Sequence, residues 1–145
     1  MDDVDLHTWV EHLGVEECWH RLAAAPVGRL GVIYDSVPEI YPVNHAVDGE
    51  TIVFRVDPGR MLAGLGRSPT VSFEVDGMDI GNEAGWSVLV KGRAVELDDE
   101  DELRRVGGLA LHPWSVGAKS HWVRITPVEV TGRRVGHGRD DAPRG

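Results

Sequence analysis

Cysteine is nearly absent from this sequence: Cys18 is the only one among 145 residues. A single thiol excludes an intramolecular disulfide framework and a zinc site built from several thiolates. Because Cys18 stands beside Trp19 on the apolar side of an expected helix, we interpret it as a buried core thiol.

Long apolar runs are missing as well. No stretch approaches the roughly 18 consecutive apolar residues of a membrane-spanning helix. The opening segment, Met1–Asp5, is acidic and lacks the basic flank and apolar stretch of a secretory leader. We therefore expect a cytoplasmic protein that does not act at a membrane.

Positive charge is also scarce. The chain has 15 lysines and arginines against 24 aspartates and glutamates, a formal net charge of −9. Such a chain repels a phosphate backbone overall, so nucleic acid is not expected as a partner.

What the chain does contain is a series of short segments rich in β-branched residues and separated by turn signals. The first three are Val27–Tyr34, Glu39–Val47 and Thr51–Val56, and Asp48-Gly49 between the last two is typical of a hairpin. Three further strands are expected at Thr70–Val75, Trp86–Leu97 and His121–Thr126, the last extending towards Val135. Gly92 predicts a bend or bulge within its strand, and residues 76–85 are expected to form a loop.

Helical periodicity is confined to short segments. Residues 1–25 are expected to form a helical region that packs on the β-structure, with one short helix up to Leu13 and a second over Val15–Ala24. One or two helical turns are expected at Arg60–Gly66, and the acidic run 98–102 is typical of a helix start. Residues 26–135 then form a mainly β domain, an antiparallel barrel with short flanking α-helices, and 136–145 are expected to be a disordered tail.

Common catalytic motifs are missing. The sequence has no Walker-type phosphate loop, no dinucleotide fingerprint and no nucleophile elbow. The seven histidines are scattered, and His45, His112 and His121 could meet only through the fold, so no metal site is predicted.

A family resemblance rests on five segments in a characteristic order. They are Pro38–Gly49, Ile52–Arg55, Val71–Asp76, Gly85–Ala94 and His121–Ile125. From about Glu17 to Arg134 the chain resembles the pyridoxamine 5′-phosphate oxidase-like family, the FMN-binding split barrels, and in particular the small bacterial branch that contains nitroimidazole-resistance proteins. The resemblance implies a six-stranded split β-barrel and a homodimer with two flavin mononucleotides (FMN) at the subunit interface.

The resemblance also implies where the flavin binds. The implied cofactor-binding residues are Pro42, Val43, Asn44, Phe54, Arg55, Arg60, Met61, Trp86, Ser87, Val88, Trp122 and Arg124. The residues themselves support part of this, because Arg55 and Arg60 flank an Asp-Pro-Gly turn and could both reach one phosphate. The alternative is that these two arginines are surface residues that balance acidic neighbours. His45 is a weak candidate for an acid or base, because it stands on the expected ring-side strand and titrates near neutrality.

The phosphate segment departs from the family pattern. Relatives of this branch commonly carry Phe-Arg-Thr-x-x-Gly-x-Lys, whereas Val56 and Met61 stand here at the threonine and lysine positions. We expect an FMN-dependent oxidoreductase of a small-molecule redox substrate. The alternatives are a non-catalytic split-barrel protein without a cofactor, or one that binds haem or a deazaflavin (F420).

Overall fold

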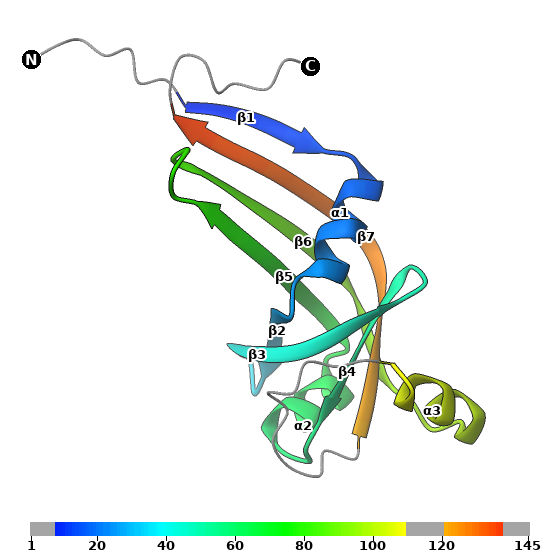
Figure 1. Ribbon diagram of the computed structural model, residues 1–145. Helices are drawn as coiled ribbons and strands as arrows, with labels where there is room; N and C mark the ends of the chain where they lie inside the picture. The colour runs from blue at the N-terminus through cyan, green and yellow to red at the C-terminus, as the bar shows by residue number, and fades with distance from the viewer. Residues whose placement is uncertain (1–7, 110–120, 138–145) are drawn as a thin grey trace, which may run out of the picture.

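The computed structural model describes residues 8–109 and 121–137 (Figure 1). The strands in this part of the chain are β1 (Thr8–Leu13), β2 (Val27–Tyr34), β3 (Val37–Asp48), β4 (Thr51–Val56), β5 (Thr70–Asp79), β6 (Ala84–Glu96) and β7 (His121–His137). The helices are α1 (Val15–Ala24), α2 (Arg60–Arg67) and α3 (Glu100–Gly107). The expected positions of these strands and helices are confirmed except at three places described below.

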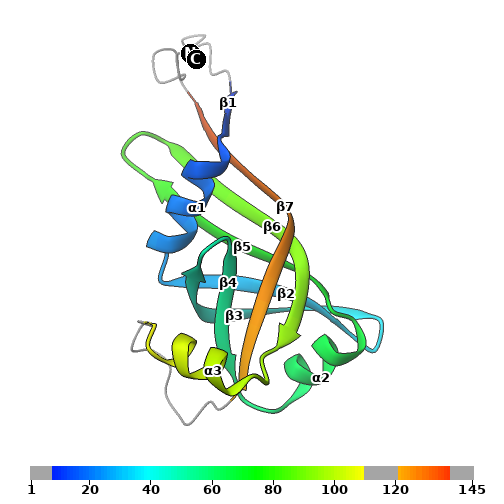
Figure 2. The same ribbon diagram turned by 90° about the vertical axis from the view of Figure 1, so that its right-hand side faces the viewer.

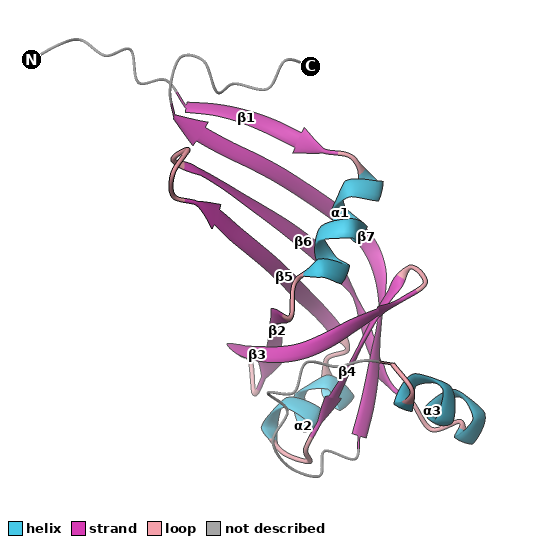
Figure 3. Ribbon diagram, in the orientation of Figure 1, coloured by secondary structure: helices cyan, strands magenta, loops and turns pink. Residues whose placement is uncertain are grey.

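Antiparallel pairing closes six of the strands into a ring. The hydrogen-bonded order is β7-β4-β3-β2-β5-β6, and β6 pairs back onto β7. The ring is weakest between β2 and β5, which pair only over Arg29–Gly31. Figure 3 shows that the helices lie around the strands rather than between them. The expected mainly β fold, an antiparallel six-stranded split barrel with short flanking helices, is confirmed.

Apolar side chains fill the inside of the barrel. On β5, Val71, Phe73 and Val75 are buried while Ser72 is exposed, which is the alternation expected of a half-buried strand. The largest fully buried side chains are Phe54, Phe73, Leu22, Leu30, Ile52 and Ile125. Because the interior is filled, the barrel's ends and outer surface are the places where a ligand can bind.

Strands β6 and β7 continue beyond the barrel. The first part of β7 pairs with β4 and its last part pairs with β1, so this one strand runs the length of the molecule (Figure 2). Helix α1 lies against β7, β6 and β3. The ladder between β6 and β7 shifts register between Lys91 and Gly92, which confirms the expected bulge.

The helix expected up to Leu13 is wrong, because this segment forms β1. Its apolar spacing suits a helix, but it pairs in register with the free edge of β7, from Thr8 opposite His137 to Leu13 opposite Gly132. Trp9 is then buried against Gly136, where a Cβ atom would collide with the indole ring. Backbone pairing with a distant strand has overridden the local pattern.

Two irregular segments were also wrongly predicted. Residues 76–79 and 84–85 are paired parts of β5 and β6, so the loop expected over 76–85 shrinks to a turn over 80–83. Gly136 and His137 belong to β7 rather than to a disordered tail. The remainder of that tail, 138–145, lies outside the described residues, as does His112.

The acidic helix start is confirmed at α3. The side chain of Asp99 accepts a hydrogen bond from the backbone N–H of Glu102 at 2.9 Å, and the first turn carries further carboxylates. No helix within the described ranges is long and apolar enough to cross a membrane.

Candidate functional site

A pocket of about 370 Å³ lies between β3, β4 and the start of α2. Its lining residues are Tyr41, Pro42, Val43, Arg55, Val56, Asp57, Gly59, Arg60 and Met61. The ladder between β3 and β4 runs from the pair Asp48–Thr51 only as far as His45–Phe54. The two strands are no longer paired beyond that point, where their residues line the pocket. We call it the β3–α2 pocket.

Five of the residues implied by the resemblance line this pocket: Pro42, Val43, Arg55, Arg60 and Met61. Four lining residues were not among the predicted site residues, namely Tyr41, Val56, Asp57 and Gly59. The sequence could have identified these four residues. Each of them is adjacent to a predicted site residue or lies in the turn between two of them.

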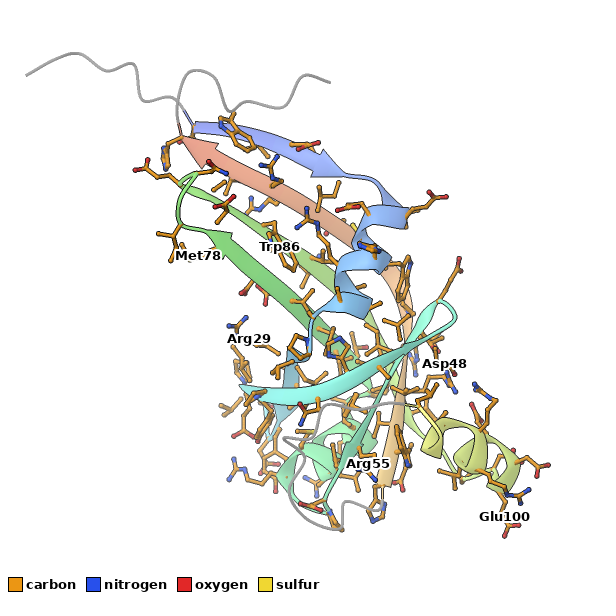
Figure 4. The ribbon with its side chains drawn as sticks, viewed as in Figure 1. Arg29, Asp48, Arg55, Met78, Trp86 and Glu100 are labelled. Atoms are coloured by element: carbon orange, nitrogen blue, oxygen red, sulfur yellow. The ribbon has the colours of Figure 1, made fainter. Side chains whose placement is uncertain are left out.

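Arg55 lies on the β4 side of the pocket and is half-buried (labelled in Figure 4). Its guanidinium carbon is 5.5 Å from the centroid of the Trp122 ring. Its Nε is buried and has no hydrogen-bond partner among the residues described. A buried N–H group without an acceptor is costly, so Arg55 has an unused donor for an anion bound in the pocket.

Arg60 is exposed at the first position of α2, and two side chains of the barrel hold its guanidinium. The guanidinium carbon lies 4.6 Å from the centroid of the Tyr34 ring, and Nη2 donates to Oε2 of Glu39 at 3.2 Å. Partial desolvation, reinforced by the nearby carboxylate of Glu39, raises the pKa of Tyr41. Its phenol is therefore protonated at neutral pH.

The start of α2 adds backbone donors to this pocket. Gly59 occupies the N-cap position and supplies no side chain to accept from the first-turn amides. Free amides and the positive end of the helix dipole both favour an anion. Together with Arg55 and the apolar wall formed by Pro42 and Val43, they suit a ligand with an anionic group and an apolar body.

Trp86, Ser87 and Val88 do not line this pocket. Figure 4 shows Trp86 in the part of the molecule beyond the barrel, far from Arg55. Its ring lies against Gly77 and under the guanidinium of Arg21, whose carbon is 4.7 Å from the ring centroid. Ser87 lines a second pocket of about 420 Å³. Val88 is fully buried in the core.

Phe54 and Asn44 lie on the strands of the pocket but do not line it. Phe54 is fully buried in the barrel core. Asn44 is half-buried on β3, opposite Val27 of β2.

The two implied residues of β7 serve the packing of α3. Trp122 is buried with Val53 and Val106, and it reaches the pocket only through its contact with Arg55. Arg124 donates to Asp48 Oδ2 at 2.8 Å and to Glu102 Oε1 at 2.6 Å, so it ties the β3–β4 hairpin to α3. The hydrogen bonds that Asp48 accepts from Arg105 and Arg124 lower the pKa of its carboxyl group.

His45 lies in the core and not in the β3–α2 pocket. It is only 6% exposed, its Nε2 donates to the carbonyl of Leu22 at 2.7 Å, and its ring meets Phe73 edge-on. Burial lowers its pKa, so the ring is neutral at physiological pH. The position favours a structural role over acid–base chemistry or haem ligation.

Among the described residues, no histidine lines the β3–α2 pocket. Nδ1 of His121 lies 2.7 Å from Oε2 of Glu96. Residues 8–109 and 121–137 contain no group of three or more His, Cys, Asp or Glu side chains placed to hold a metal ion.

Solved structures with the same fold include two FAD-binding proteins. The one from Mycobacterium smegmatis is 37% identical, covers 88% of this chain and 100% of its own, and superposes with a TM-score of 0.75. The one from Mesorhizobium loti is 30% identical over 86% of this chain and 97% of its own, with a TM-score of 0.74.

The nitroimidazole-resistance branch is also represented among similar folds. A structure from Bacteroides thetaiotaomicron, of a protein proposed to confer 5-nitroimidazole antibiotic resistance, has a TM-score of 0.75 over 94% of this chain and 95% of its own. At 13% identity it supports the fold alone. The family model for pyridoxamine 5′-phosphate oxidase matches residues 14–134, which include every residue of the β3–α2 pocket. The chain therefore belongs to the pyridoxamine 5′-phosphate oxidase family, as its motifs indicated.

Proposed function

We propose that this protein is a flavin-dependent oxidoreductase that binds the phosphate end of its flavin in the β3–α2 pocket. Membership of the family and the FAD-binding relative from Mycobacterium smegmatis support a flavin. The observation that carries the proposal is Arg55, whose half-buried guanidinium lines the pocket with an unused Nε donor.

The residues of the pocket fit the parts of a flavin. Arg55, Arg60 and the first amides of α2 would hold a phosphate. Pro42 and Val43 would offer an apolar surface and backbone groups to the ring system. A bound flavin supplies electron or hydride transfer to a small-molecule substrate, while these residues bind it, orient it and exclude water.

Two flavins are candidates for this pocket. The family resemblance implies FMN, whereas the relatives from Mycobacterium smegmatis and Mesorhizobium loti bind FAD. Both cofactors carry a phosphate at the end of the ribityl chain, so the same protein groups would serve either one.

A homodimer is the second part of the proposal. Trp86 and Ser87 stand outside the β3–α2 pocket of their own chain, although the resemblance implies that they contribute to flavin binding. A second copy of the chain could supply them to the pocket of the first. The flavin would then lie between two subunits.

The test is substitution of Arg55. Arg55→Gln removes a charge-assisted contact of about 1.5–3 kcal/mol, so flavin affinity should fall about tenfold to a hundredfold. The measurement is titration of purified protein with FMN and with FAD, followed by quenching of flavin fluorescence. Circular dichroism checks that the variant is folded.

The matched control is Arg104→Gln. Arg104 is 75% exposed on α3 and pairs with Asp101 at 3.4 Å, away from the pocket. This variant should bind flavin as the wild type does. Equal affinity in Arg55→Gln and wild type, or failure of the wild type to take up either flavin, would contradict the proposal.

A further inference from the structure

Glu39 lies beside the pocket's exposed cation, Arg60, and is not among the cofactor-binding residues that the resemblance implies. Its Oε2 accepts from Nη2 of Arg60 at 3.2 Å, and its side chain is only 24% exposed. Its second oxygen, Oε1, is buried and has no hydrogen-bond partner within the described part of the chain. A half-buried carboxylate of this kind acts strongly on neighbouring charges, because water screens it less than a surface group.

The carboxylate changes the charge of the proposed phosphate subsite. Among the pocket's lining residues, Arg55 and Arg60 are positive and Asp57 is negative, which leaves one net positive charge. Glu39 adds a negative charge next to Arg60 and brings the total to zero. Met61 adds no charge, whereas the resemblance implies a lysine at this position.

This balance matters because the phosphate at the end of the ribityl chain carries a different charge in the two flavins, although their total phosphate charge is similar. The phosphate of FMN is a monoester, whose second proton leaves near a pKa of about 6, so it carries nearly two negative charges at neutral pH. Each phosphate of FAD is bonded on both sides and keeps a single negative charge. A subsite without net positive charge therefore penalises the FMN phosphate more than the first phosphate of FAD.

We propose that Glu39 is a specificity-determining residue: its carboxylate neutralises Arg60 and makes the β3–α2 pocket prefer a dinucleotide flavin over FMN. This inference rests on the proposed function, because it assumes that a flavin phosphate lies in this pocket. Glu39 acts through Arg60 and through the local charge, without taking part in the redox reaction.

The test compares three flavins on wild type and on Glu39→Gln. Glutamine keeps the shape of the side chain and an acceptor for Arg60, so the substitution removes little besides the charge. The probes are FMN, FAD and riboflavin, which has the same ring system and no phosphate. Each is titrated into the full-length protein by fluorescence quenching.

We expect wild type to bind FAD more tightly than FMN. Glu39→Gln should raise the affinity for FMN about fivefold to tenfold, which is the effect of about one partly screened charge. The gain for FAD should be about twofold, and the affinity for riboflavin should not change. Glu50→Gln is the control, because Glu50 is exposed in the β3–β4 turn and the same loss of charge there should alter none of the three affinities.

The possible failures are distinguishable. If wild type binds flavins but Glu39→Gln leaves the ratio of FMN to FAD affinity unchanged, the role of Glu39 is overturned and the flavin site stands. An equal gain for riboflavin would overturn it too, because the substitution would then act on shape rather than on phosphate charge. If wild type binds none of the three flavins, the proposed function falls together with this inference.

Discussion

At the scale of single residues, the β3–α2 pocket is cationic in some positions and apolar in others. Arg55 and Arg60 supply donors, while Val56 and Met61 line the same pocket without any. Val56 is buried, and it has methyl groups at the position where the resemblance implies the hydroxyl group of a threonine. In the proposed function, two guanidinium groups and the backbone of α2 would therefore hold the phosphate.

Restoring the family pattern should strengthen binding. The double variant Val56→Thr with Met61→Lys adds a hydroxyl donor and a cation to the pocket, and FMN affinity should rise about tenfold or more. Flavin titration measures this, with Met78→Lys as the control because Met78 is 81% exposed on the β5–β6 hairpin. Unchanged FMN affinity in the double variant would show that these side chains do not face the phosphate.

His45 predicts a pH dependence of stability. Burial lowers its pKa in the folded protein, so the unfolded chain takes up the proton more readily. The free energy of unfolding should be at its full value above about pH 6.5 and should decrease as the pH falls below it, by up to about 1.4 kcal/mol per pH unit. In His45→Gln, this contribution to the pH dependence of the free energy of unfolding should be lost.

Urea unfolding between pH 5 and pH 8 is the measurement. His20→Gln is the control, because His20 is exposed on α1 and its removal should leave the slope unchanged. The same slope in wild type and His45→Gln would show that the buried ring does not account for the pH dependence.

At the scale of elements, the bulge in β6 decides how the barrel continues into the longer strands. Gly92 stands where the ladder to β7 shifts register, and it lies directly against the backbone of Thr126 and Pro127. Pro127 has no backbone N–H and cannot donate a hydrogen bond to the ladder. The bulge therefore lies where the pairing between β6 and β7 is already interrupted. A side chain at position 92 has no space, because the atoms it would meet belong to the backbone.

Gly92→Ala should therefore destabilise the protein by about 1–3 kcal/mol. Gly107→Ala is a matched control at the end of α3, where a new Cβ meets nothing within 4 Å. Alanine there should leave stability unchanged or raise it by up to about 1 kcal/mol. Chemical denaturation compares the two, and a Gly92→Ala variant as stable as wild type would contradict the role given to the bulge.

At the scale of the whole molecule, the residues implied for one flavin site lie in two separate regions. The β3–α2 pocket is at the barrel, while Trp86 is in the extended part formed by β1, β5, β6 and β7 (Figures 1 and 4). One chain does not bring these regions together. Assembly of two copies is the arrangement in which both could serve one cofactor.

The native mass tests this arrangement. Two chains of 15.9 kDa should give a particle of about 32 kDa by light scattering or sedimentation. The dimer should persist on dilution to the concentrations used for flavin titration. A mass of one chain under those conditions would contradict the shared site, while leaving the β3–α2 pocket available within a single chain.

Local features were predictable because a few consecutive residues contain the necessary information. Asp48-Gly49 forms the expected hairpin turn, with Gly49 at a φ of +62° that glycine adopts readily. Arg55 and Arg60 reach the same pocket because the turn between them is short. The alternation of β5 and the bulge at Gly92 are likewise properties of one segment.

Tertiary structure alone decided the features that join distant segments. Thr8 lies opposite His137, 129 residues away, and this pairing makes β1 a strand despite its helical spacing. Glu39 reaches Arg60 across 21 residues only because the start of α2 lies beside the start of β3 in the folded chain. Side-chain periodicity and turn geometry act over a few residues. The sequence by itself therefore predicted the six strands of the barrel and the pair of arginines, but not β1. Two features depend on residues that only the folded chain brings together. One is the strand edge with which β1 pairs, and the other is the carboxylate that neutralises Arg60.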